Sequence, residues 1–329
     1  PMKIPLTLFL FNLCILSSCS VKERMIKLQK EKPAPVAESV DESKITQPGD
    51  YTIFLNHQGK MRYYKIHIPK SYSPNQPTPL VLALHGGGGD MEIQATDKYY
   101  NQISKSEKEG YIVIFPNGYS MFKSGKLATW NAGRCCGDAR DEKIDDVGFI
   151  KEIVMNVQKQ ANIDRKRIFA SGMSNGGMMA YRLACELPDI FKAVAAVAGT
   201  DNTAVCTPKS PVSILHIHAQ NDDHVIYKGG AGKTFRDPSK VTNFTSVPAT
   251  IEKWKKLNGC VTPAKKTLAV KGAFCETYAE CTNKTEVKLC VTDSGAHSWP
   301  GGSKPRGIGE TPSTAISATD VIWDFFKTK

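Results

Sequence analysis

Ser174 lies in a short segment whose residue types suit nucleophilic attack by a serine. Gly172 and Gly176 flank it two positions away on either side, an apolar run at residues 167–170 precedes it, and an amphipathic stretch at 176–187 follows. The order is therefore strand, sharp turn and helix. Such a turn leaves room only for small residues around the serine. The start of the helix also directs backbone N–H groups toward it. The pattern predicts that Ser174 is a nucleophile.

A serine hydroxyl is a poor nucleophile until a base removes its proton. Among the seven histidines, His297 stands on a small-residue loop directly after a predicted strand at 287–291. A carboxylate must then hold the imidazole in the correct tautomer. Asp222 and Asp223 follow the predicted strand at 212–218. We take Asp222 as the acid, with Asp223 as the alternative, because an aspartate there can equally cap a turn.

The negative charge that forms on a tetrahedral intermediate needs donors that are already in place. Four successive glycines, residues 86–89, follow the predicted strand at 80–84 and permit close approach of the backbone. We expect one donor to be the N–H of Gly87, with Gly88 as the alternative. The second expected donor is the N–H of Asn175, which follows the nucleophile.

These residues must be positioned by the ends of buried strands. Short, nearly continuous apolar runs alternate with amphipathic helical segments, which predicts an α/β fold with a mostly parallel central sheet and helices on both faces. An antiparallel hairpin is expected first, from runs at 51–55 and 62–69. The other predicted strands are 80–84, 111–115, 167–170, 193–197 and 212–218, and the predicted helices are 97–109, 146–161, 176–187, 250–257 and 318–326.

The N-terminal region is typical of an exported protein. Lys3 precedes an apolar run at residues 5–16 that is too short to span a bilayer. The run ends in Leu-Ser-Ser-Cys, a lipobox-like sequence that makes Cys19 the expected attachment point to a bacterial membrane. We therefore divide the chain into a signal peptide (1–19), a disordered tether (20–47) and one catalytic domain (48–329). Without lipidation of Cys19, the protein would be secreted or periplasmic.

Composition argues against several other classes of function. The formal net charge is +11, but the 43 Lys and Arg residues are scattered among 32 Asp and Glu residues, so no nucleic-acid partner is expected. Ten cysteines are present; without Cys14 and Cys19, an even set of eight remains, which favours disulfides in an exported chain. No metal site is expected, because His216 and His218 lack a third ligand.

Two further segments carry a resemblance to a known family. With the motifs above, residues 129–137 (TWNAGRCCG) and 144–149 (IDDVGF) resemble the esterase family that includes polyhydroxybutyrate depolymerase-like enzymes and the feruloyl and acetylxylan esterases. Membership implies an α/β-hydrolase fold, no cofactor and hydrolysis of esters outside the cytoplasm. It assigns Ser174, Asp222 and His297 as the triad. The sequence departs from the family pattern in the acid loop, where Ala219 and Ile226 replace the usual glycine and proline.

The resemblance also places the segment 130–137 at the rim of the active site. Trp130 and Trp299 would then contact the substrate; ordinary burial in the core is the competing interpretation of both. Asp145 and Asp146 are interpreted as acids that cap the helix at 146–161.

Several disulfide pairings are expected. A hairpin of residues 273–280 and 286–291 would pair Cys275 with Cys290, which leaves Cys260 for Cys281. Cys135 and Cys136 would pair with Cys185 and Cys206 in an order that remains open.

The leading hypothesis is an exported serine carboxylic-ester hydrolase that works through an acyl-enzyme intermediate. Feruloyl or acetyl esters of polysaccharides and hydroxyalkanoate oligomers are the expected substrates. One alternative is a polyester depolymerase of the polyhydroxybutyrate type. Another is a surface binding protein on a hydrolase scaffold that has lost turnover.

Overall fold

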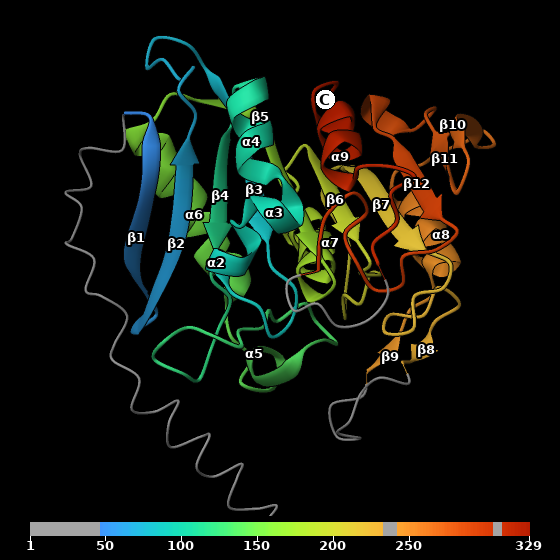
Figure 1. The fold of residues 1–329 in the computed structure, drawn as a ribbon, viewed down its shortest axis with the longest axis horizontal. Helices are drawn as coiled ribbons and strands as arrows, with labels where there is room; N and C mark the ends of the chain where they lie inside the picture. The colour runs from blue at the N-terminus through green and yellow to red at the C-terminus, as the bar shows by residue number, and fades with distance from the viewer. Residues whose placement is uncertain (1–46, 233–241, 305–310) are drawn as a thin grey trace, which may run out of the picture.

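A ten-stranded sheet forms the centre of the computed structural model, which describes residues 47–232, 242–304 and 311–329 (Figure 1). The strand order is β1-β2-β4-β3-β5-β6-β7-β12-β11-β10. The predicted signal peptide, Cys19 and nearly all of the predicted tether lie outside the described residues. Within the described part of the chain, no helix combines the length and the apolar character needed to cross a membrane.

The middle of the sheet is parallel and its two margins are antiparallel. Strands β4, β3, β5, β6, β7 and β12 run in one direction, whereas β1, β2, β10 and β11 are joined by antiparallel pairings. The predicted N-terminal hairpin and the mostly parallel sheet are thus confirmed. The strand bounds are β1 (Gly49–His57), β2 (Lys60–Ile68), β3 (Thr78–Leu84), β4 (Ile112–Pro116), β5 (Ile163–Met173), β6 (Ala193–Val197), β7 (Ser213–Ala219), β10 (Lys265–Val270), β11 (Ala273–Tyr278) and β12 (Val287–Thr292). A separate two-stranded sheet pairs β8 (Gly230–Ala231) with β9 (Asn243–Phe244).

Every residue of β3, β4, β6 and β7 is buried, because helices cover both faces of the sheet (Figure 1). One face packs against α6 (Asp146–Gln160), α7 (Asn175–Glu186) and α8 (Val247–Leu257). The other packs against α2 (Met91–Gln94), α3 (Asp97–Tyr100), α4 (Gln102–Glu109) and α9 (Ala318–Phe326). The short elements α5 (Gly137–Asp141) and η3 (Thr282–Lys284) lie in connections.

The helix predicted over residues 97–109 is in fact two helices. Asn101 adopts a left-handed conformation with φ of 52° and ends α3 before α4 begins. Asparagine tolerates this conformation better than most residues. The prediction was wrong here because helical periodicity on either side of one residue does not report the backbone angle at that residue.

Strand β10, which the sequence analysis missed, forms one margin of the sheet. Five of its six residues are exposed, and its pairing with β11 shifts register between Lys266 and Leu268. An edge strand with little burial lacks the apolar alternation that identifies a half-buried strand.

Four disulfides occur among the described residues, and two of them agree with the predicted pairing. Cys275 pairs with Cys290 across β11 and β12, and Cys260 pairs with Cys281. The remaining prediction was wrong, since the structure pairs Cys135 with Cys136 and Cys185 with Cys206. Cys185 lies at the end of α7, next to the segment that contains Cys206. The adjacent residues Cys135 and Cys136 are bonded to each other. Disulfides persist in oxidising compartments, so these bridges are consistent with export.

Candidate active site

Ser174 occupies the turn between β5 and α7 in a backbone conformation that few residues adopt, with φ of 54° and ψ of −122°. The flanking glycines are required by close packing. A Cβ atom at position 172 would lie 2.4 Å from the backbone of Gly176, and one at position 176 would lie 2.3 Å from the carbonyl oxygen of Leu84. No side chain fits at those distances. The turn therefore holds Ser174 at the carboxyl end of β5, in the strained geometry that the glycine spacing predicts.

Ser174, His297 and Asp222 form one hydrogen-bonded chain. Nε2 of His297 lies 2.9 Å from Oγ of Ser174, and Nδ1 of His297 lies 2.9 Å from Oδ2 of Asp222. A carboxylate only accepts, so Nδ1 carries the proton and Nε2 is free to accept from the serine hydroxyl. Asp223, the alternative acid, is exposed to solvent. The structure thus brings the three predicted residues together and places Asp222, not Asp223, beside the imidazole.

The carboxylate of Asp222 is held by several donors. Its Oδ1 accepts from the backbone N–H groups of His224 (2.8 Å) and Val225 (2.9 Å), and its Oδ2 lies 3.3 Å from Nε2 of His218. Burial acts to raise the pKa of Asp222. The charge of His297 and the hydrogen bonds from His218 and His297 outweigh that effect and hold the pKa well below its usual range. Asp222 therefore stays ionised at neutral pH.

His218, which contacts this carboxylate, belongs to a chain of buried side chains that continues to His216 and Tyr181. His218 lies 2.7 Å from the carbonyl oxygen of Val225 through Nε2 and 3.0 Å from Nε2 of His216 through Nδ1. The hydroxyl of Tyr181 lies 2.8 Å from Nδ1 of His216. Burial first, and His218 second, lower the pKa of His216 well below the ordinary value, so this ring is neutral. Tyr181 donates to His216, His216 to His218, and His218 to the acid loop. Both ring nitrogens of His216 and of His218 are thus engaged in hydrogen bonds.

The glycine loop after β3 carries the N–H of Gly87 close to Asn175, the residue after the nucleophile. The N–H of Gly88 donates to the carbonyl oxygen of Ala128 at 2.8 Å, and that of Gly89 donates to Gly86 at 3.0 Å. Within residues 47–232, 242–304 and 311–329, the N–H of Gly87 donates to no acceptor. A Cβ atom at Gly87 would lie 3.5 Å from Cβ of Asn175, so the two predicted donors are neighbours. The N–H of Asn175 belongs to the first turn of α7 and has no partner within its helix. This geometry favours Gly87 over Gly88.

Whereas the backbone N–H of Asn175 is a predicted oxyanion donor, its side chain fixes the backbone at Trp130. Its Oδ1 accepts from the N–H of Trp130 at 2.7 Å, and its Nδ2 donates to the carbonyl oxygen of Trp130 at 3.0 Å. The indole N–H of Trp130 donates to the carbonyl oxygen of His85 at 3.0 Å. The segment around residue 130 is therefore tied directly to the predicted oxyanion loop.

Both tryptophans that were expected to contact substrate are core residues. Trp130 is completely buried and Trp299 is 3% exposed, so neither offers surface to a ligand. Trp299 packs edge-on against Tyr100, and its indole N–H donates to Thr319 at 3.0 Å. The expectation of substrate contact was wrong, and ordinary burial is the correct interpretation of both residues.

His85, which immediately precedes the glycine run, is a structural residue. Its Nε2 accepts from the N–H of Gly118 at 2.9 Å, and its Nδ1 lies 2.8 Å from the carbonyl oxygen of Gly86. Burial lowers the pKa of His85 to about 4. A neutral ring with its proton on Nδ1 satisfies both contacts.

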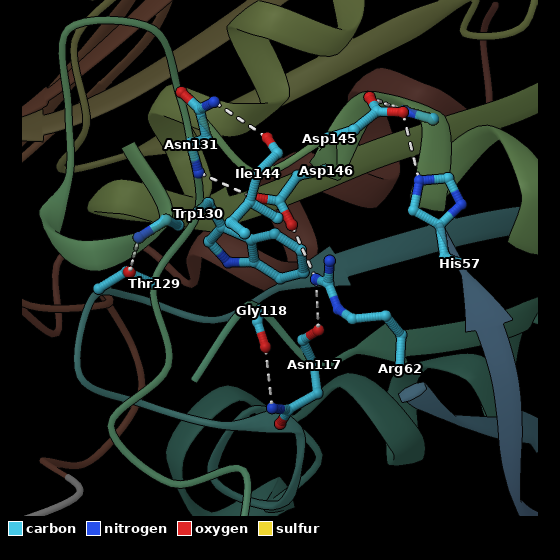
Figure 2. A network of polar contacts seen from close by, with 12 residues as sticks. His57, Arg62, Asn117, Gly118, Thr129, Trp130, Asn131, Ile144, Asp145 and Asp146 are labelled. Carbon is cyan, nitrogen blue, oxygen red and sulfur yellow. Dashed lines mark hydrogen bonds and ion pairs between the residues drawn. The ribbon is translucent and has the colours of Figure 1, made fainter. Parts of the chain in front are cut away.

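Asp145 and Asp146 differ, although both were interpreted as caps. Asp145 does cap α6, because its carboxylate accepts from the N–H of Gly148 at 2.9 Å. Asp146 is completely buried and pairs with Arg62 at 2.7 Å, as Figure 2 shows. Capping was the wrong interpretation of Asp146. The motif that includes it carries an ion pair whose partner lies 84 residues earlier.

The fold and the hydrogen-bonded chain define the class: an α/β protein with serine, histidine and aspartate at the carboxyl edge of its sheet. The family model described as "Putative esterase" matches residues 56–297. The chain therefore belongs to this esterase family, and the predicted family and α/β-hydrolase fold are confirmed.

Individual relatives of this chain are also described as esterases. Feruloyl esterase B of Piromyces equi is 28% identical over 242 residues, which cover 70% of this chain and 42% of that relative. A probable feruloyl esterase C of Aspergillus niger is 31% identical over 220 residues, covering 63% of this chain and 74% of the relative. The chain thus matches less than half the length of the first of these proteins.

A solved structure agrees in fold. The acetyl xylan esterase from Aspergillus awamori superimposes with a TM-score of 0.56 at 14% identity, covering 85% of this chain and all of that one. At that identity the likeness concerns the fold alone.

Proposed function

We propose that this protein is an exported serine carboxylic-ester hydrolase that works through an acyl-enzyme intermediate. One observation carries the proposal: the continuous hydrogen-bonded chain from Ser174 through His297 to Asp222, with both links at 2.9 Å. The buried, ionised carboxylate fixes the imidazole tautomer. The imidazole is then ready to accept the serine proton.

In the first half of the reaction, Nε2 of His297 takes the proton from Ser174 while Oγ attacks the ester carbonyl carbon. The carbonyl π electrons move to oxygen, and the N–H groups of Gly87 and Asn175 stabilise the resulting oxyanion. Collapse of this intermediate breaks the bond to the alcohol, which leaves with the proton from His297. Water then attacks the acyl-enzyme in the same way, which releases the acid and restores Ser174.

The proposal is tested by measuring kcat of the Ser174→Ala variant on p-nitrophenyl acetate or butyrate. Removal of the nucleophile is expected to lower kcat by roughly 10⁶-fold, as in other enzymes with this triad. The unchanged fold of the variant is checked by circular dichroism. Turnover near that of the wild type, or failure of a fluorophosphonate to label Ser174 in the wild type, would contradict the proposal. The second result would favour the binding-protein hypothesis.

For the substrate, we propose feruloyl or acetyl esters of polysaccharides. The names of the relatives, which include feruloyl esterases and a bifunctional acetylxylan esterase/xylanase, support this class. A comparison of kcat/KM for methyl ferulate, acetylated xylan and hydroxybutyrate oligomers decides between polysaccharide esters and polyesters. A preference for the oligomers would replace the proposed substrate class while leaving the mechanism unchanged.

For the location, we propose that Cys19 is lipidated and anchors the enzyme to a bacterial membrane. The lipobox-like sequence supports the proposal, and the disulfides are consistent with export. Expression with a labelled fatty acid, with Cys19→Ala as control, tests it. A wild-type protein that carries no label would contradict it.

A further inference from the structure

Arg62 and Asp146 form an ion pair inside the protein that the proposed reaction does not use directly. The side chain of Arg62 is 4% exposed and that of Asp146 is not exposed at all. Burial acts to raise the pKa of Asp146, against the effect of Arg62. Two charges removed from water need excellent geometry and further hydrogen bonds to be tolerated. The further hydrogen bonds of this pair all lead to backbone near the active site.

One branch leads from Asp146 to Asn175. Oδ2 of Asp146 accepts from the N–H of Asn131 at 2.8 Å, next to Trp130, as Figure 2 shows. Trp130 is in turn held by both side-chain polar atoms of Asn175. The carboxylate thus fixes the one segment to which the side chain of Asn175 is bound. Asn175 supplies a proposed oxyanion donor through its own backbone.

The other branch leads from Arg62 to the glycine loop. The guanidinium of Arg62 donates to the carbonyl oxygen of Asn117 at 3.2 Å, as Figure 2 shows. The next residue, Gly118, donates its N–H to Nε2 of His85 at 2.9 Å. His85 immediately precedes the glycine run that contains Gly87. The carbonyl oxygen of His85 also accepts from the indole of Trp130 at 3.0 Å.

The two branches therefore close into a ring. It runs from Arg62 through residues 117–118 to His85, from His85 through residues 130–131 to Asp146, and back to Arg62. Both proposed oxyanion donors adjoin this ring, Gly87 through His85 and Asn175 through Trp130. None of the ring members needs to touch the reacting atoms. Their common effect is on the position of two backbone N–H groups.

We infer that the Arg62–Asp146 pair is a positioning device for the oxyanion hole, and this inference rests on the proposed ester hydrolysis. The pair sets the separation and orientation of the Gly87 and Asn175 N–H groups. Its loss is expected to weaken stabilisation of the tetrahedral intermediate more than binding of the ground-state ester. A small misplacement of catalytic groups costs about 10²-fold in rate.

The test compares Asp146→Asn with the wild-type enzyme on p-nitrophenyl butyrate. We expect kcat to fall by about 10²-fold while KM changes by less than about threefold, because the donors act on the oxyanion. Inhibition by butylboronic acid, whose serine adduct is tetrahedral like the intermediate, is expected to weaken in parallel with kcat. A KM increase with unchanged kcat and unchanged boronate affinity would overturn the inference.

A double variant separates positioning from stability. Replacement of both partners by apolar residues, Arg62→Met with Asp146→Leu, removes the buried charges together, a change that often preserves stability. It also removes the contacts to residues 117 and 131. We expect a variant that unfolds at nearly the wild-type urea concentration but keeps the low kcat. If kcat returns with stability, the pair acts through folding alone and the inference fails.

Lys105→Met serves as the matched control, because Lys105 is a nearly buried cation paired with Glu109 and Asp320 between α4 and α9. It should destabilise the fold but leave kcat unchanged. A wild-type enzyme without any esterase activity would refute the proposed function. Wild-type activity that persists in Asp146→Asn would refute only the present inference.

Discussion

Asp222 and Asp223 are adjacent in sequence, yet their carboxylates have different surroundings. Asp222 is buried among donors from His218, His224, Val225 and His297, whereas Asp223 faces solvent. Asp222→Asn is expected to lower kcat by about 10⁴-fold, because an amide can favour the wrong imidazole tautomer. Asp223→Asn is the matched control and should stay within about twofold of wild type, as expected for a surface change.

Steady-state assays of both variants on p-nitrophenyl acetate check this prediction. Equal activity losses in the two variants would contradict the assignment of Asp222 as the single acid. A large loss in Asp223→Asn alone would reverse the assignment.

Residue types predicted which three side chains meet in one hydrogen-bonded chain, but predicted the surroundings of other residues poorly. Ser174 and His297 could be found because the elbow and the loop after a strand impose local constraints on sequence. The choice of Gly87 over Gly88 depends on a hydrogen bond to Ala128, about 40 residues away, which no local pattern reports. The same holds for Asp146. Its partner, Arg62, lies on a different element, so the carboxylate resembled an ordinary helix cap.

At the scale of elements, a disulfide joins β11 to β12 directly before the loop that carries His297. Cys275 and Cys290 are 15 residues apart in sequence. Replacement of both by alanine is expected to lower the free energy of unfolding by about 3 kcal/mol, mainly because the unfolded chain gains freedom. Urea unfolding followed by fluorescence measures the loss.

The pair Cys260 and Cys281, 21 residues apart, provides a comparison. Because the entropic effect depends only weakly on loop length, the two double-alanine variants should be destabilised to a similar extent. Unfolding midpoints indistinguishable from that of the wild type would contradict this account of both bridges.

Elements with a strong apolar pattern could be predicted closely, and elements without one could not. The predicted strand at 193–197 and helix at 318–326 match β6 and α9. β6 is buried throughout, and α9 buries the face that carries Ile322, Phe325 and Phe326. Strand β10 was missed because its stability comes from pairing with β11 rather than from burial of its side chains. Tertiary pairing of this kind leaves little signal in a single sequence.

At the scale of the whole molecule, three imidazoles link stability to pH. Burial is the largest cause of the low pKa values of His85, His216 and His224. The pKa is lowered from 6.5 to about 4 for His85 and His224, and well below 6.5 for His216. The unfolded chain binds protons on these groups below about pH 6.5, whereas in the folded protein His85 and His224 bind them only near pH 4 and His216 only well below pH 6.5. Stability should therefore fall as pH is lowered through this window. His85 alone would contribute roughly 3 kcal/mol across it, at about 1.4 kcal/mol per pKa unit.

Urea unfolding at pH 7, 6, 5 and 4 measures this slope. His85→Gln keeps a polar side chain without an imidazole, so we expect a shallower slope between pH 6.5 and 4.5. Above pH 4.5, carboxylates with ordinary pKa values contribute little. A slope that is absent in the wild type, or unchanged in the variant, would show that these rings do not control acid stability.

The exposed margin formed by β10 has a consequence for behaviour at high concentration. An unpaired strand edge is a template on which a second chain can add a strand and begin aggregation. Here that edge begins with Lys265 and Lys266, and the register shift after Lys266 interrupts its regular pairing. Both features disfavour the docking of another strand. At this margin, therefore, copies of the protein that collide at high concentration are not expected to join their sheets into fibrils.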